Sequence, residues 1–155
     1  MIVVLDTSCI SAFILCGRVE TLLDILKGHE IVITEQVHYE LMLSKKELLK
    51  NFRHSRISIQ PAESAIADKY NIHIGEASVI LLASAKGALA VIDDKRARKA
   101  ANGEGIAFIG TATLIRLGLE KKTLTLSEAK RLIDQLTTAG RLYLDQDILD
   151  WILGG

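Results

Sequence analysis

The chain has 155 residues, of which 49% are hydrophobic and 25% charged, which excludes a disordered chain and favours one domain over residues 1–155. Nineteen Lys and Arg balance nineteen Asp and Glu, which argues against coating nucleic acid through bulk charge but allows a local basic patch. The start carries Asp6 and lacks a basic leader, so we expect neither a signal peptide nor a membrane span, and a cytoplasmic protein. Cys9 and Cys16 form no CxxC motif and are interpreted as small core residues in a reducing compartment.

The segment at residues 2–5, Ile-Val-Val-Leu, predicts a short buried strand, because every position is apolar, as in parallel sheets covered on both faces. Asp6 follows at once. Thr7 or Ser8 is expected to cap a helix over residues 7–16. We further expect a helix over residues 18–27 and a strand over residues 31–33.

Strands and helices continue to alternate along the chain. Thr34 is expected to cap the next helix, and Ser44 to Glu47 forms a capping box that predicts another. The further expected elements are an exposed strand at 57–59, helices at 62–70 and 75–86, a strand at 88–92, a basic helix at 95–102, a strand at 106–109, and helices at 111–119, 125–139 and 144–153. This order predicts an α/β domain with a short, mostly parallel sheet between helices, and a helical extension from about residue 123.

Acidic side chains are expected to meet at the carboxyl edge of this sheet, where ligands of such folds bind. Asp6 ends the first strand and the Asp93-Asp94 pair ends the fourth. Glu40 lies about two turns into the helix after the second strand, and Glu76 lies in the first turn of the helix before the fourth. Such carboxylates repel one another unless a cation compensates them, and Mg²⁺ or Mn²⁺ prefers such oxygens. Because these ions activate water and hold phosphate oxygens, the pattern indicates phosphodiester hydrolysis.

Each acid also has an explanation that needs no ligand. Asp6 and Asp94 are plausible N-caps, Glu76 is favoured by the helix dipole, and Glu40 fits a solvated helix face.

Two further features flank the expected acidic edge. Thr111, after Gly110, either caps the next helix or orients a metal ligand or water. The basic side chains of the helix at 95–102 either hold a phosphate backbone or form a solvated face; they are Lys95, Arg96, Arg98 and Lys99.

Several motifs together resemble a PIN domain, of the kind found in VapC-type toxins. They are VLDTS at residues 4–8, TEQVHYEL at 34–41, GEA at 75–77, VIDDKRAR at 91–98 and GT at 110–111. The resemblance runs from the first strand to Thr111, which is most of the chain.

The resemblance implies a three-layer α/β/α sandwich and a ribonuclease that depends on Mg²⁺ or Mn²⁺. It implies a homodimer, and an antitoxin protein that covers the site. By position it implies that the metal-binding acids are Asp6, Glu40, Glu76 and the Asp93-Asp94 pair. Thr111 and Ser8 are expected to support the metal shell, and Lys95 or Arg96 to grip RNA.

This sequence departs from the family pattern at two positions. Glu76 stands where Asp is often found, and Ser8 stands where Asn is frequent. The choice between Asp93 and Asp94 as ligand stays open, because Asp94 fits the register better while Asp93 is placed to face the crevice. The extension past residue 123 receives no role beyond packing or partner contact.

Two other hypotheses are kept beside the ribonuclease. One is a catalytically weak PIN-like module that binds RNA or metal in a complex, which the neutral net charge mildly favours. The other is a phosphatase of the haloacid dehalogenase kind, which also begins with a strand and an Asp. That chemistry needs a second Asp where this chain has Ser8, which argues against it.

Overall fold

The computed structural model describes residues 1–154 and contains a five-stranded parallel sheet with the strand order β3-β2-β1-β4-β5. Gly155, the last residue of the expected domain, lies outside the described residues. The strands are β1 (Ile2–Leu5), β2 (Glu30–Thr34), β3 (Ile57–Gln60), β4 (Leu89–Val91) and β5 (Phe108–Ile109). The mostly parallel sheet expected from the sequence is confirmed.

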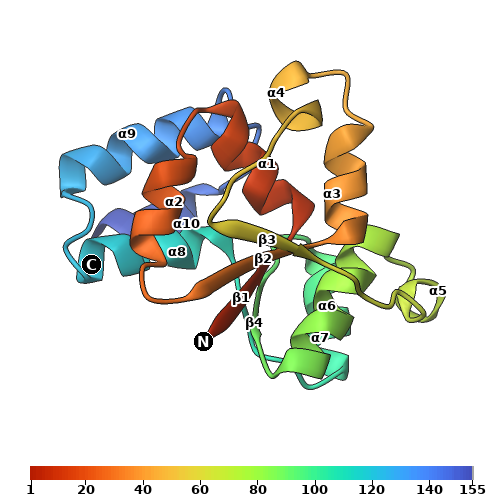
Figure 1. The fold of residues 1–155 in the computed structure, drawn as a ribbon. Helices are drawn as coiled ribbons and strands as arrows, with labels where there is room; N and C mark the ends of the chain where they lie inside the picture. The colour runs from red at the N-terminus through yellow and green to blue at the C-terminus, as the bar shows by residue number, and fades with distance from the viewer. Residues whose placement is uncertain (155) are drawn as a thin grey trace.

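Ten helices lie within residues 1–154 and surround the sheet (Figure 1). They are α1 (Thr7–Leu15), α2 (Val19–Ile25), α3 (Glu35–Met42), α4 (Glu47–Lys50), α5 (Ala67–Tyr70), α6 (Ile74–Lys86), α7 (Lys95–Gly103), α8 (Thr111–Glu120), α9 (Leu126–Thr137) and α10 (Gln146–Gly154). Helix α6 packs on β1, β2 and β4 and is joined by α5 and α7, while α2, α8, α9 and α10 pack together as a second group. The arrangement is the expected α/β/α sandwich.

The centre of the sheet is buried on both faces. Val3, Val4 and Leu5 of β1 are buried, as are Val32 of β2 and Ala90 of β4. An apolar strand of this kind is stable only between two layers, because either face would otherwise expose hydrophobic surface to water. Strand β1 therefore takes the central position, and its end carries Asp6 into the middle of the carboxyl edge.

Two expected helices are much shorter in the structure. The helix expected at 62–70 forms only as α5, because the carbonyl of Ala62 accepts a hydrogen bond from Gln36 Nε2 at 2.5 Å and holds this segment beside α3. The expected capping box at Ser44 is also wrong. Ser44 Oγ accepts from Lys46 N at 3.1 Å, so it forms a turn before the one-turn helix α4.

The C-terminal helices form close to their expected positions. Thr125 Oγ1 accepts from Glu128 N at 3.1 Å and caps α9, as the second capping box predicts. Among the described residues, every helix is too short or too polar to cross a lipid bilayer.

Candidate active site

Asp6 lies where β1 passes into α1 and is almost completely buried, with 3% of its surface exposed. Its Oδ1 accepts from Cys9 N at 2.8 Å, and its Oδ2 accepts from Asp93 N at 3.1 Å. The prediction that Thr7 or Ser8 caps this helix is therefore wrong, since Asp6 itself is the N-cap. One carboxylate both begins α1 and joins the ends of the neighbouring strands β1 and β4.

The charge on Asp6 is costly in this position. Burial raises the pKa of Asp6 from the ordinary 3.8 to about 7, and the negative charge of Asp93 acts in the same direction. The two backbone N–H groups oppose this shift without cancelling it. A group of this kind either stays protonated near neutral pH or has a cation beside it.

Asp93 is held by Thr111 at the start of α8. Thr111 N donates to Asp93 Oδ1 at 2.9 Å, and Thr111 Oγ1 donates to Asp93 Oδ2 at 2.6 Å. Thr111 is itself fully buried, so this pair fixes the Asp93 carboxylate beside Asp6. The Thr111 hydroxyl thus bonds Asp93, one of the candidate metal ligands, while Gly110, and not Thr111, is the N-cap of α8.

Asp94 has a different local role. Its Oδ2 accepts from Ala97 N at 3.0 Å and caps α7, while the side chain remains exposed. Asp93 is therefore fixed beside Asp6, whereas Asp94 faces Glu76, whose pKa it raises. Each member of the pair lies beside a different acid.

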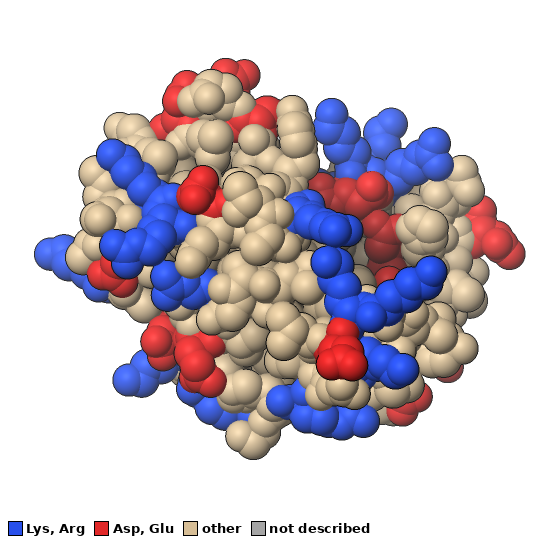
Figure 2. Space-filling model, turned by 90° about the horizontal axis from the view of Figure 1, so that it is seen from above, with Lys and Arg blue, Asp and Glu red and all other residues tan. Residues whose placement is uncertain are grey.

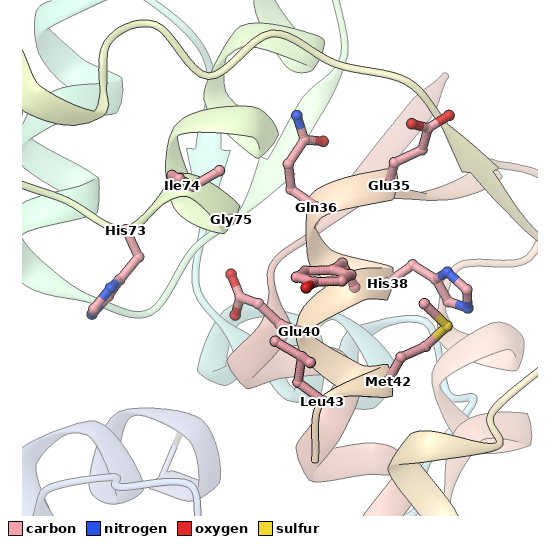
Figure 3. A pocket seen from close by; sticks show the side chains of 10 residues that line it. Glu35, Gln36, His38, Glu40, Met42, Leu43, His73, Ile74 and Gly75 are labelled. Carbon is pink, nitrogen blue, oxygen red and sulfur yellow. The ribbon is translucent and has the colours of Figure 1, made fainter.

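Glu76 and Glu40 come from two helices that face each other. Glu76 Oε1 accepts from His73 N at 3.0 Å at the start of α6. Partial burial raises the pKa of Glu76, and the charges of Asp94 and Glu40 add to this effect against the His73 N–H bond. Figure 3 shows the Glu40 side chain reaching from α3 toward the start of α6.

Gly75 makes room for Glu40. A Cβ on Gly75 would overlap the Glu40 carboxylate, so glycine here leaves room for this position of the Glu40 side chain. Thr34 fixes the same pair of helices, because its Oγ1 lies 2.7 Å from Ser78 Oγ on α6 and accepts from Val37 N at 3.0 Å at the start of α3. Gly75 belongs to the GEA motif at residues 75–77, but the motif alone does not predict this steric role.

The structure thus brings the predicted acids to one edge, where they act on one another electrostatically. Across residues 1–154, no three His, Cys, Asp or Glu side chains stand in an arrangement ready to hold a metal ion. The donor chemistry nevertheless fits a hard divalent cation, because the cluster offers only carboxylate oxygens and crowds negative charge around buried Asp6.

The predicted basic residues lie at the edge of this cluster. Lys95 and Arg96 are exposed in the first turn of α7. Figure 2 shows acidic side chains in a hollow of the face seen from above, with Lys and Arg side chains around it. The overall charge is neutral, but positive charge gathers locally beside the acids.

Arg98 differs from its neighbours. Its Nε donates to the carbonyl of Ile92 at 2.9 Å, and its guanidinium lies 6.0 Å from the centre of the Phe108 ring. A Cβ on Gly110 would overlap this guanidinium. The interpretation of Arg98 as a phosphate contact is therefore replaced by a role in holding the ends of β4 and β5.

Ser8, predicted to support the metal shell, is exposed on the first turn of α1. It lines a hollow together with Asp93, Asp94 and Lys95. Its backbone carbonyl accepts from Ser11 Oγ at 3.3 Å. Ser8 thus borders the acidic edge.

Comparison with known families assigns the chain. The model of the family DUF3368, described as a PIN domain, matches residues 2–154. The chain therefore belongs to this PIN-domain family, which confirms the resemblance found in the motifs. No curated protein and no solved structure gives a significant match. PIN domains are generally nucleases and typically use divalent metal ions, so membership indicates nuclease-type activity.

Proposed function

We propose that this protein is an endoribonuclease that depends on Mg²⁺ or Mn²⁺. The observation that carries the proposal is the buried Asp6 carboxylate, bonded to the Asp93 backbone and surrounded by further acids, in a chain of the PIN family. A stable fold places unpaired like charges together only at a cost, and a divalent cation removes that cost.

In this proposal the acids of the edge bind the cation. Asp6, Glu40, Glu76 and one or both of Asp93 and Asp94 supply the oxygen ligands. When bound, the cation supplies Lewis-acid activation of water and neutralises charge on the phosphate.

The supporting residues hold the acids and the substrate. Thr111 keeps both Asp93 oxygens in place, and Ser8 supports the same edge. Lys95 and Arg96 hold the RNA backbone, so that the scissile phosphate lies beside the acids for in-line attack by water.

The test is cleavage of a mixed, structured RNA pool by the purified protein with Mn²⁺, with Mg²⁺ and with EDTA. The Asp6→Asn variant is run in parallel, and Asp134→Asn on the exposed face of α9 serves as the matched charge control. Cleavage that requires the ion, persists in Asp134→Asn and is lost in Asp6→Asn supports the proposal. Cleavage by Asp6→Asn at the wild-type rate refutes the assignment of Asp6.

The alternative function is a catalytically weak module that binds RNA or metal in a complex. Calorimetric titration with Mn²⁺ and RNA separates the two functions. Binding of both without cleavage, in protein free of any copurified partner, favours the module.

We further propose that the protein acts in the cytoplasm as the toxin of a toxin–antitoxin pair and forms a homodimer. The resemblance to VapC-type toxins supports this proposal. An apolar hollow of about 880 Å³ lies between α3 and the start of α6 and adjoins Glu40 (Figure 3). Tyr39, Leu43 and Ile74 line it and are largely exposed, which is unusual for side chains without a partner.

Two measurements test these partners. Light scattering of the purified chain gives its mass, and a monomer at all concentrations refutes the homodimer. Co-expression with the product of a small adjacent gene is expected to suppress both cleavage and growth arrest, and unchanged cleavage by the co-purified pair refutes the antitoxin.

A further inference from the structure

A second hollow begins at the acidic edge and leads away from it along the C-terminal extension. It has a volume of about 590 Å³, within the range of roughly 300–1,000 Å³ that small-molecule sites occupy. Asp93, Asp94 and Lys95 line it on the side of the candidate active site, and residues 140–143 line it on the side of the C-terminal segment. A neighbouring hollow of about 510 Å³ shares Lys46 and Arg141 with it. Because they share these residues, the two hollows form one track along the surface.

The segment at 140–143 is fixed on the body of the protein. A Cβ on Gly140 would lie 2.6 Å from the carbonyl oxygen of Leu136 and 2.9 Å from that of Ala12, so the backbone packs directly on α9 and α1. Leu142 is 8% exposed, and its N–H donates to the Leu136 carbonyl at 2.8 Å. Figure 1 shows the end of α9 beside the end of α1. These contacts hold the segment beside the acidic edge, although Asp93 and Asp94 lie more than forty residues earlier in the chain.

Alternation along this fixed segment presents two side chains to solvent. Arg141 adopts a left-handed backbone conformation with φ of 59° and is exposed, Leu142 points into the core, and Tyr143 is 84% exposed. An aromatic ring with so little packing contributes little to folding. At a groove that leads to a nuclease site, it offers a face on which a base can stack.

Away from the candidate active site, the lining of the track is more basic than acidic. Its acids are Asp93 and Asp94 at the candidate active site and Glu47 at the far end, while its cations are Lys95 beside the site and Lys46 and Arg141 farther along. A protein helix docks through several apolar side chains. The track exposes Leu48 and Tyr143, whereas the hollow beside Glu40 exposes more such side chains: Tyr39, Met42, Leu43 and Ile74. Phosphates and bases, rather than a peptide, match the chemistry of this track.

We propose that the segment at 140–143 is a subsite for single-stranded RNA, in which Arg141 and Lys46 contact the backbone phosphates and Tyr143 stacks on a base next to the cleaved bond. The inference rests on the proposed ribonuclease function and assigns its substrate groove to the C-terminal extension. These residues are positioning residues, since they contact the substrate away from the reacting phosphate.

The test measures binding separately from cleavage. Fluorescence anisotropy of a labelled single-stranded RNA is recorded with Asp6→Asn protein, which keeps the strand intact, against the same protein carrying Arg141→Asn or Tyr143→Ala. Asn tolerates the left-handed backbone at position 141, so this change removes charge without adding strain. Arg131→Ala, on the exposed face of α9, is the charge control, and Tyr143→Phe keeps the ring.

Tyr143→Ala is expected to weaken binding about five-fold or more, and Tyr143→Phe to restore it. Arg141→Asn is expected to weaken binding and to lower the slope of log affinity against log salt by about 0.7. Arg131→Ala is expected to leave both unchanged.

Equal binding by all variants overturns the subsite, even when the wild-type protein cleaves RNA. Loss of binding to a partner protein with unchanged RNA binding also overturns it. The proposed function fails separately, if wild-type protein with metal leaves RNA intact.

Discussion

Replacing Asp6 by Asn is expected to stabilise the metal-free protein at about pH 8, although Asp6 is the central acid of the candidate site. The pKa of Asp6 is raised from 3.8 to about 7 by burial and by Asp93. At about 1.4 kcal/mol for each tenfold change in the dissociation constant, ionised Asp6 costs the fold about 4 kcal/mol. Asn removes this cost but keeps only one of the two hydrogen bonds from backbone N–H groups, a loss of about 1–3 kcal/mol.

The net gain is therefore about 2 kcal/mol, or a rise in Tm of roughly 4–8 °C for a domain of this size. The sign depends on pH. Because the folded-state pKa lies above the unfolded-state value, the stability that a protonated Asp6 provides is complete below about pH 4 and is lost as pH rises through about 7. The advantage of Asn should disappear toward pH 4 and reverse there.

The assay is thermal denaturation followed by circular dichroism in EDTA, from about pH 4 to pH 8. Asp134→Asn, an exposed change of the same charge, should shift Tm little at any pH. A Tm of Asp6→Asn below that of the wild type at pH 8, or a difference independent of pH, refutes the argument that burial and Asp93 make this charge costly.

Three further predictions concern the same edge. Thr111→Val removes the 2.6 Å hydrogen bond to Asp93 and is expected to lower cleavage about tenfold and stability by about 1–3 kcal/mol. RNA cleavage and thermal denaturation measure the two effects. Thr111→Ser should keep both cleavage and stability, and an equal loss in Thr111→Ser contradicts the prediction. Gly75→Ala should displace the Glu40 carboxylate and therefore lower RNA cleavage about as much as Glu40→Ala does. The double variant should cleave no more slowly than Glu40→Ala alone, and additive losses contradict the steric explanation. Adding Mn²⁺ at one hundred times its Kd should stabilise wild-type protein by about 2.7 kcal/mol, seen as a higher Tm, but should stabilise Asp6→Asn much less.

The sequence by itself determined the layers of the fold and the identity of the acids. Runs such as residues 2–5 are apolar at every position, as in strands covered on both faces, and β1 is accordingly central. The family motifs lie within the same segments, so the sequence alone indicates Asp6, Glu76 and the Asp93-Asp94 pair. Local capping rules worked at Thr34 and Thr125, where the cap bonds its own helix.

Only the tertiary structure decided which oxygen meets which partner. Ser44 has the pattern of a capping box, but the chain turns there instead. Asp6 caps α1 through one oxygen, while the backbone N–H of Asp93, 87 positions later, donates to the other. The clearance at Gly75 and the approach of residues 140–143 to the acidic edge depend on elements packed from distant parts of the chain. Sequence periodicity reports which face of an element is buried, whereas these contacts depend on how the buried faces are oriented against one another.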